Sequence, residues 1–169
     1  GIPKVVIGCM DPFSMVAGRG IEKLRKAGIK VTVGVLEKEC QQLIRRFITF
    51  NTRKRPFITL KWAESADGFI DKNREGGSPV LFSTPLTSML VHKRRAEHNA
   101  ILVGRKTALL DNPSLNTRNW FGKDPIRLDI DKNLTLPQQL HLFDGKVRTL
   151  IFTEQNATSH HPLVEYIRL

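Results

Sequence analysis

The amino-acid sequence predicts an α/β fold in which helices flank a mixed, twisted sheet. Three observations support this fold class. Residues 4–33 pass from a strand pattern to a helix pattern and back to a strand, as in a βαβ unit. Residues 100–110 pass from a buried strand through a glycine into a short helix. Residues 125–131 and 147–153 have the length and apolar content of two further strands.

The first half of the βαβ unit is a buried-strand pattern at 4–9, followed by a helix at 21–27 that ends at Gly28. A second strand follows at 29–33. One βαβ unit cannot bury both of its faces, so we expect it to belong to a larger sheet. A single amphipathic helix is expected at 36–51. Its apolar stripe consists of Leu36, Cys40, Leu43, Ile44, Phe47 and Phe50.

A basic, proline-ended turn at 52–56 indicates an exposed junction between two units. The strand expected after it, at 57–65, carries Lys61 on the face that Phe57 and Thr59 share. Two interpretations of Lys61 stay open. It is either a solvated residue on an open face or an ammonium group that points into a cleft.

A hydroxyl cap and a proline at 83–85 predict the start of a helix that ends in the basic residues 93–95. The side chains expected to face the core are Leu86, Met89, Leu90 and Val91.

The stretch 99–118 is the centre of the functional interpretation. Its strand, Gly104, a short helix and the loop 114–118 place amides, a hydroxyl and cations at the carboxyl end of a strand, where open α/β sheets bind phosphorylated ligands. An ordinary strand-to-helix turn is the alternative, because one glycine is a weaker signal than a glycine-rich fingerprint. Between the two later strands we expect a loop, and beyond Thr153 no further element.

Composition narrows the ligand classes. The 27 basic and 16 acidic residues give a net charge of +11, which attracts anions wherever positive side chains converge. Because no base-stacking motif is present, we expect small phosphorylated ligands and no nucleic acid. No run approaches the roughly 20 apolar residues of a membrane span, and no signal peptide opens the chain, so we expect a cytoplasmic protein without a membrane partner. Cys9 and Cys40 lack zinc-site spacing, so no metal is expected.

These residues resemble the bifunctional deaminase-reductase family of riboflavin biosynthesis. The first part resembles the end of its zinc-dependent pyrimidine deaminase domain, through Val5-Val6-Ile7-Gly8, Asp11-Pro12, Ala17-Gly18-Arg19-Gly20-Ile21, Leu24, Ala27-Gly28 and Val31. From Arg55 on, the chain resembles the reductase domain, through LKWAESADGFI and KRRAEHNAILVGRKTALLDNPSLNTR. The implied domains are 1–52, a βαβ-α remnant of a cytidine-deaminase-like domain, and 53–169, the first part of a dihydrofolate-reductase-like domain.

The resemblance implies NADPH-dependent reduction of the ribosyl group of 5-amino-6-(5-phosphoribosylamino)uracil to a ribityl chain. By position, the residues that contact the nicotinamide cofactor are Ala63, Leu81, Thr107 and Asp111. Those that contact the phosphorylated ribosylaminopyrimidine are Ser78, Arg95, Leu115 and Arg118, with Lys61 as an additional cation. The two arginines suit a phosphate because guanidinium groups bind it in a bidentate way. No catalytic residue is assigned.

Two parts of the family's machinery have no counterpart in this sequence. The zinc ligands of the deaminase would precede Gly1, so the family's zinc is not expected here and neither is deamination. The later glycine-rich cofactor segment would follow Leu169, so we expect an incomplete chain. The alternative to a reductase is a non-catalytic phosphate-binding or assembly fragment. We also expect a homodimer, because exposed sheet edges need a cover.

Overall fold

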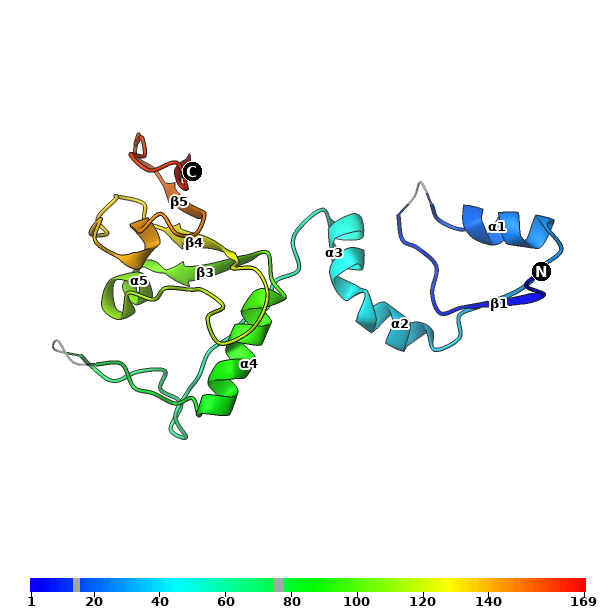
Figure 1. The fold of residues 1–169 in the computed structure, drawn as a ribbon, viewed down its shortest axis with the longest axis horizontal. Helices are drawn as coiled ribbons and strands as arrows, with labels where there is room; N and C mark the ends of the chain where they lie inside the picture. The colour runs from blue at the N-terminus through cyan, green and yellow to red at the C-terminus, as the bar shows by residue number, and fades with distance from the viewer. Residues whose placement is uncertain (14–15, 75–77) are drawn as a thin grey trace. The chain divides into compact units, whose positions relative to one another are not determined.

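The computed structural model describes residues 1–13, 16–74 and 78–169, which divide into two compact units, 1–61 and 62–169 (Figure 1). The first unit begins with β1 (Lys4–Ile7), α1 (Arg19–Lys26) and β2 (Lys30–Val33). The two strands pair in parallel, with Lys4 opposite Lys30, which confirms the predicted βαβ unit. Gly28 ends α1 with a φ of 77°, a left-handed conformation that glycine adopts without steric cost.

The single helix predicted at 36–51 is wrong. Two helices occupy this region, α2 (Glu37–Leu43) and α3 (Arg45–Arg53), and they are separated at Ile44. Neither of these described helices contains a buried residue. The apolar stripe is therefore mostly exposed, with Leu43 at 86% and Phe50 at 63%. Because no side chain of the described α2 and α3 is buried, tertiary packing does not stabilise a single continuous helix across Ile44.

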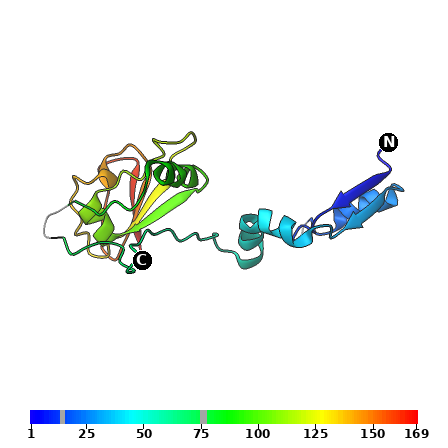
Figure 2. The same cartoon turned by 90° about the horizontal axis from the view of Figure 1, so that it is seen from below.

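The second unit contains a four-stranded sheet of β3 (Ala100–Gly104), β4 (Ile126–Ile130), β5 (Thr149–Thr153) and β6 (Val164–Arg168), in that order. Figure 2 shows these strands running side by side, coloured from green to red. The α/β fold class is confirmed, but every pairing among the described strands is parallel, so the mixed sheet expected from the sequence is not seen there. Strand β6 lies in the region where no further element was expected.

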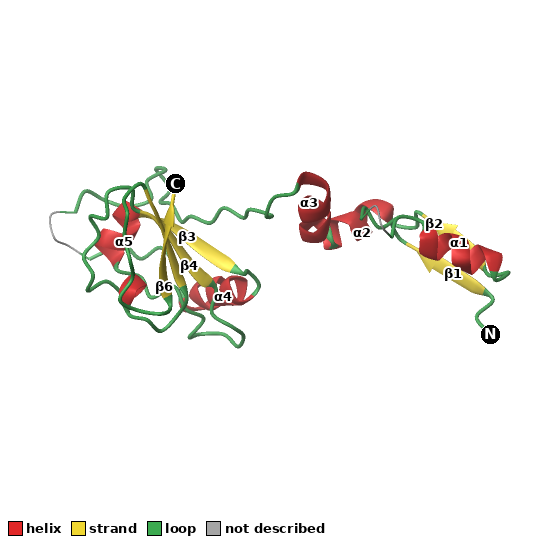
Figure 3. Ribbon diagram, turned by 90° about the horizontal axis from the view of Figure 1, so that it is seen from above, coloured by secondary structure: helices red, strands yellow, loops and turns green. Residues whose placement is uncertain are grey.

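Two helices accompany this sheet, α4 (Pro85–Ala96) and α5 (Arg105–Asp111), and a short 3-10 helix, η1 (His141–Phe143), lies in the predicted loop (Figure 3). Thr84 caps α4 as expected, since its side chain accepts a hydrogen bond from the amide of Thr87 at 3.2 Å. However, Leu86 and Leu90 are exposed rather than directed to the core, and His92 is the residue that α4 buries. Of the three basic residues in the last turn of α4, Arg95 makes a part-buried hydrogen bond to the loop that contains Asn116.

The core of the second unit lies between α5 and the segment that follows β4. Its buried members are Ala108, Leu115, Leu136, Leu140 and Leu142. Ile101 and Val103 of β3 pack against this cluster. The predicted strand at 57–65 is wrong, because the structure assigns no strand there. Ile58 and Leu60 are 64% and 77% exposed, so this apolar alternation has no buried face in the described residues.

Candidate functional site

Two of the predicted substrate residues meet at a third residue, Asn116. The Nη1 of Arg95 donates to the backbone oxygen of Asn116 at 3.0 Å, and the Nη1 of Arg118 donates to its side-chain Oδ1 at 2.9 Å. Burial lowers the pKa of Arg95, and the positive charge of Arg118 lowers it further. The two guanidinium groups therefore lie close enough to repel each other, and an anion bound between them would offset this repulsion.

The loop that carries Asn116 is fixed by the residues on either side of it. Leu115 is 3% exposed and belongs to the core, and it adopts a φ of 52°. Thr117 is 4% exposed, and both its amide and its hydroxyl donate to Oδ1 of Asp124 at 2.7 Å. Because both neighbours of Asn116 are anchored, the acceptor that holds the two arginines is preorganised.

The predicted cofactor residue Asp111 is the last residue of α5, and its side chain is already paired. The Nη1 of Arg74 lies 2.6 Å from Oδ1 of Asp111, while the Nη2 of Arg74 pairs with Asp71. The hydrogen bonds that Arg74 donates to these two carboxylates raise its own pKa and lower the pKa of Asp71. Any contact of Asp111 with a cofactor must accommodate this bridge or exchange for it.

A pocket of about 500 Å³ opens where β3 and β4 end. Gly104 and Ile130 are opposite each other at this edge of the parallel sheet. The pocket is lined by Arg105, Ile130, Asp131, Lys132, Asn133 and Thr135. The carboxyl edge of a parallel sheet is where open α/β folds bind their ligands.

The polar groups of this pocket are held in place by hydrogen bonds. The Nε of Arg105 donates to the hydroxyl of Thr135 at 2.6 Å and lies 3.6 Å from Oδ1 of Asp131. The carboxylate of Asp131 accepts from the amide of Leu136 at 2.7 Å and from the hydroxyl of Thr135 at 3.2 Å. With Lys132 at the rim, two cations border a pocket whose volume suits a small ligand.

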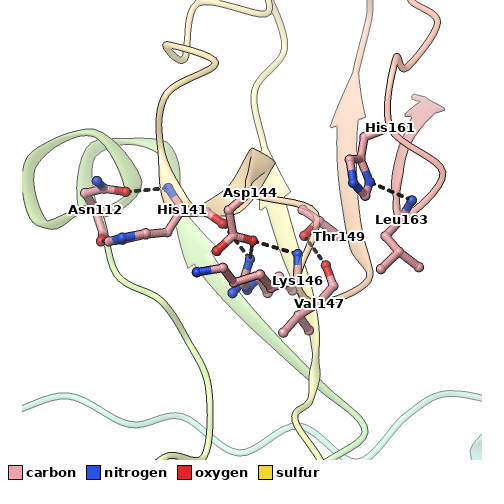
Figure 4. A network of polar contacts seen from close by, with 9 residues as sticks. Asn112, His141, Asp144, Lys146, Val147, Thr149, His161 and Leu163 are labelled. Carbon is pink, nitrogen blue, oxygen red and sulfur yellow. Dashed lines mark hydrogen bonds and ion pairs between the residues drawn. The ribbon is translucent and has the colours of Figure 1, made fainter.

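The segment beside this pocket is tied to the body of the unit by a second polar network. His141 bonds to Asn112, its amide donating to Oδ1 of Asn112 at 2.6 Å (Figure 4). Asp144 accepts from Arg127 at 2.7 Å and from the amide of Lys146 at 3.0 Å. These contacts hold η1 and the residues after it against the end of α5 and against β4, and thus keep the leucines between them in the core.

In the described part of the chain, no side-chain hydrogen bond or ion pair joins the remaining predicted residues to the arginine pair. Thr107 is exposed on α5, and among the described residues no hydrogen bond or ion pair joins it to Arg95 or Arg118. Ser78 and Leu81 are exposed, and Ala63 is half-buried, in segments without helix or strand. The Leu115 side chain is enclosed in the core, which leaves only its backbone for a ligand. Lys61 is exposed at the end of the first unit.

Sequence reasoning missed Asn116, His92 and the pocket residues 130–135. Asn116 and His92 carry no motif, because Asn116 accepts through its backbone as well as its side chain and His92 acts through its position on α4. The pocket had a weak signal. Arg105 and Lys132 each follow the end of a strand, so in a parallel sheet both fall at the same edge.

No group of three metal-ligating side chains exists in the described part of the chain, where Cys9 and Cys40 are free thiols. The described helices also include none that is long and apolar enough to cross a membrane.

Residues 56–163 match the family model of the RibD C-terminal domain. The chain belongs to this family. The resemblance inferred from the sequence is thereby confirmed, while the exact domain boundary near residue 52 stays a prediction.

Curated relatives extend the similarity across nearly the whole chain. The riboflavin biosynthesis protein RibD of Aquifex aeolicus is 35% identical over 98% of this chain and 46% of its own length, and that of Synechocystis sp. is 38% identical over 95% and 44%. A crystal structure of the Thermotoga maritima diaminohydroxyphosphoribosylaminopyrimidine deaminase/5-amino-6-(5-phosphoribosylamino)uracil reductase superposes with a TM-score of 0.86 at 40% identity, over 98% of this chain and 47% of that one. The chain spans about half the length of the relatives it matches.

Proposed function

We propose that this chain contributes to riboflavin biosynthesis as part of an NADPH-dependent reductase. Its substrate is 5-amino-6-(5-phosphoribosylamino)uracil, whose ribosyl group is reduced to ribityl. Membership of the RibD C-terminal domain family supports the reaction class. The observation that carries the proposal is the convergence of Arg95 and Arg118 on the anchored Asn116.

The arginine pair is suited to the 5′-phosphate of the substrate. Two guanidinium groups near one another present planar donors to a dianion, and charge-assisted hydrogen bonds of this kind are about twice as strong as neutral ones. Repulsion between the two cations is relieved when the anion arrives. Ser78, Lys61 and the backbone of Leu115 are proposed as the other substrate contacts.

The pocket at the ends of β3 and β4 fits the phosphate-bearing part of NADPH. Arg105 and Lys132 would hold the phosphates of the cofactor, since both follow strand ends at the carboxyl edge. Thr107 and Asp111, on the helix that starts at Arg105, with Ala63 and Leu81, are proposed to contact the nicotinamide half. When bound, NADPH supplies the hydride that is added to the anomeric carbon of the sugar.

The protein's own contribution is alignment. Fixing the substrate by its phosphate at Arg95 and Arg118 holds the sugar at a constant position, and fixing the cofactor by its phosphates limits the approach of the hydride donor. Holding two reactants in this way converts a bimolecular encounter into an effectively unimolecular step. We assign no deamination to this chain.

The test is NADPH oxidation with the phosphorylated substrate, followed by the loss of NADPH absorbance. Arg118→Ala is expected to raise the KM for this substrate about 10- to 100-fold, because a charge-assisted bond worth about 1.5–3 kcal/mol is lost. A dephosphorylated substrate should show no such change. Arg94→Ala is the matched control, because it removes a cation from the same helix turn. The side chain of Arg94 is 71% exposed and pairs with Glu97.

Equal losses with the phosphorylated and dephosphorylated substrates would contradict the phosphate assignment. Anion binding without NADPH oxidation would instead favour the alternative, a phosphate-binding or assembly fragment without catalysis.

We further propose a homodimer in the cytoplasm. Among the described strands, β3 and β6 are the edges of their sheet, and unpaired edges are usually covered. Two free cysteines suit a reducing compartment. Light scattering during size-exclusion chromatography measures the mass, and a monomer at all working concentrations would refute the dimer.

A further inference from the structure

His92 is a buried histidine with one unused nitrogen. It lies on α4 one turn before Arg95 and is 3% exposed. Its Nδ1 has no hydrogen-bond partner among the described residues. The backbone of Asn116 lies near enough to the ring to act on its pKa in the opposite direction to burial. His92 therefore contacts the same residue that holds both arginines.

The charges around His92 are both positive. Burial lowers its pKa, and the charges of Arg95 on the same helix and Arg118 on the loop lower it further, against a small opposing effect of the backbone of Asn116. No acidic group contributes to the pKa of His92 or of Arg95 in the described residues. Of the other nearby cations, Lys93 lies over the ring of Trp120, 5.5 Å from its centroid.

Unpartnered nitrogen atoms accompany this excess of positive charge. The Nε of Arg95 is buried and unpartnered in the described part of the chain, as is the Nδ1 of His92. Buried polar groups without a partner are costly and call for an explanation such as an absent ion. A cluster of three basic side chains, with two orphaned nitrogens and no carboxylate, is the arrangement expected of an anion site before its anion binds.

We propose that His92 is a positioning residue of the phosphate subsite, holding Asn116 in place for the two arginines and becoming the third cation of the subsite when a dianion binds. This inference rests on the proposed function, because it concerns the same subsite. In the free protein the imidazole stays neutral, which limits the repulsion among the three groups. A bound dianion favours the charged form of the ring, so anion binding and protonation of His92 reinforce one another.

The sign of the effect follows from this coupling. An anion that raises the pKa of His92 binds more tightly in the pH range where the ring takes up a proton, and the gain disappears when the ring is neutral with and without the anion. Each pKa unit by which the bound anion raises the pKa of His92 corresponds to a tenfold change in anion affinity. The gain is therefore expected to approach about tenfold between about pH 8 and about pH 5.5.

Sulfate is the probe, because it remains a dianion over this whole range, whereas a phosphate ester titrates within it. Its affinity is measured by calorimetry across the pH range for the wild-type chain and for His92→Gln. Glutamine keeps a polar group beside the Asn116 backbone, but it cannot be protonated. His98→Gln is the matched control, since His98 follows the same helix and its Nδ1 lies 2.6 Å from the oxygen of Arg94.

We expect tighter sulfate binding at low pH for the wild type and for His98→Gln, and a flat profile for His92→Gln. At high pH His92→Gln should bind as the wild type does, while His92→Ala, which also loses the polar group beside Asn116, should bind several-fold more weakly. A flat wild-type profile, or the same slope in His92→Gln, overturns the charge role. Equal affinity of His92→Gln and His92→Ala at high pH overturns the positioning role.

These outcomes are separate from the fate of the proposed reaction. If the pH profiles fail while Arg118→Ala still raises the KM for the phosphorylated substrate, His92 is structural and the reductase proposal stands. If sulfate binding behaves as expected but no NADPH is oxidised, the subsite is real and the reductase proposal fails.

Discussion

Asp129 provides the sharpest test of the folded structure. It is fully buried on β4, and neither of its carboxylate oxygens has a hydrogen-bond partner among the described residues. Burial raises its pKa from 3.8 to about 6, the neighbouring charge of Asp131 adds to the shift, and Arg105 opposes it. Below about pH 6 the folded protein therefore keeps this side chain mostly protonated, whereas the unfolded chain ionises it above about pH 4.

The sign and size of the effect follow from linkage. Because the folded pKa is above the unfolded one, Asp129 costs no stability below about pH 4, and its destabilising contribution grows as the pH rises through about 6. A difference of about two pKa units corresponds to at most about 3 kcal/mol at about pH 8, and to roughly half of that at about pH 5. Asparagine has nearly the same shape and does not ionise. Asp129→Asn is thus expected to raise the free energy of unfolding, more at high pH than at low pH.

Urea unfolding followed by circular dichroism, at several pH values, measures this difference. A stabilisation that grows as the pH rises supports the buried, unpaired carboxylate. The reasoning is refuted if Asp129→Asn has the same stability profile as the wild type, or is destabilised equally at every pH. The first result would mean that Asp129 is solvated, and the second that it has a partner that asparagine does not satisfy.

Three further predictions concern neighbouring groups. Asp144 accepts a hydrogen bond from Arg127, whose side chain is 1% exposed. Burial alone would raise the pKa of Asp144, but this bond and the amide of Lys146 outweigh burial and lower the pKa. The contribution of Asp144 to the free energy of unfolding is therefore lost as the pH falls. Asp144→Asn should therefore destabilise the chain by roughly 3 kcal/mol near neutral pH, because it leaves a buried charge unpaired, and urea unfolding showing no loss would contradict this. Asp111→Ala should weaken NADPH binding about tenfold while sparing the substrate, and fluorescence titration with unchanged affinity would count against its role. Arg105→Ala should likewise weaken NADPH more than the substrate by a similar factor, and a larger effect on substrate KM would remove the pocket from the cofactor site.

Local patterns predicted the elements whose hydrogen bonds close within a short stretch of sequence. Helix α1 with its glycine stop, α4 with its Thr84 cap and the helix stop before Pro113 all depend on neighbours a few residues away. Strand pairing and packing depend on distant residues, and there prediction failed. The alternation at 57–65 indicates which face would be apolar, but not whether another strand pairs with it. The apolar stripe at 36–51 contributes no buried residue to the described helices α2 and α3.

The site divides in the same way. Arg95 and Arg118 were identified through the family resemblance, and the structure brings them together at Asn116. The role of Asn116 could not be predicted, because a residue that accepts through its backbone and its side chain between two anchored neighbours has no signature in the sequence. The core leucines 136, 140 and 142 were missed for a related reason. They follow neither a helical nor a strand period, so only the network around η1 directs them inward.

Strand β4 shows why alternation alone does not decide which face is buried. Its apolar residues alternate with charged ones, and the usual expectation places the apolar face inside. The structure does the reverse, since Arg127, Asp129 and Asp131 are buried while Ile130 is 44% exposed. The core leucines cover the charged face because the segment after β4 folds back over it, and two of the three charges obtain partners from that segment or from α5.

The third charged residue, Asp129, has no hydrogen-bond partner among the described residues. The energetic penalty of burying the charged face of β4 therefore falls mainly on this one titratable group. A one-residue change in strand register would put Leu128 and Ile130 inside and return Asp129 to solvent. The pH dependence of Asp129→Asn therefore reports the register of β4 directly. That register also sets which side chains reach the pocket, because Asp131 contributes to the pocket lining from the same face. A stabilisation that grows with pH would support both the buried face and the placement of Asp131 beside Arg105, on which the proposed cofactor site depends.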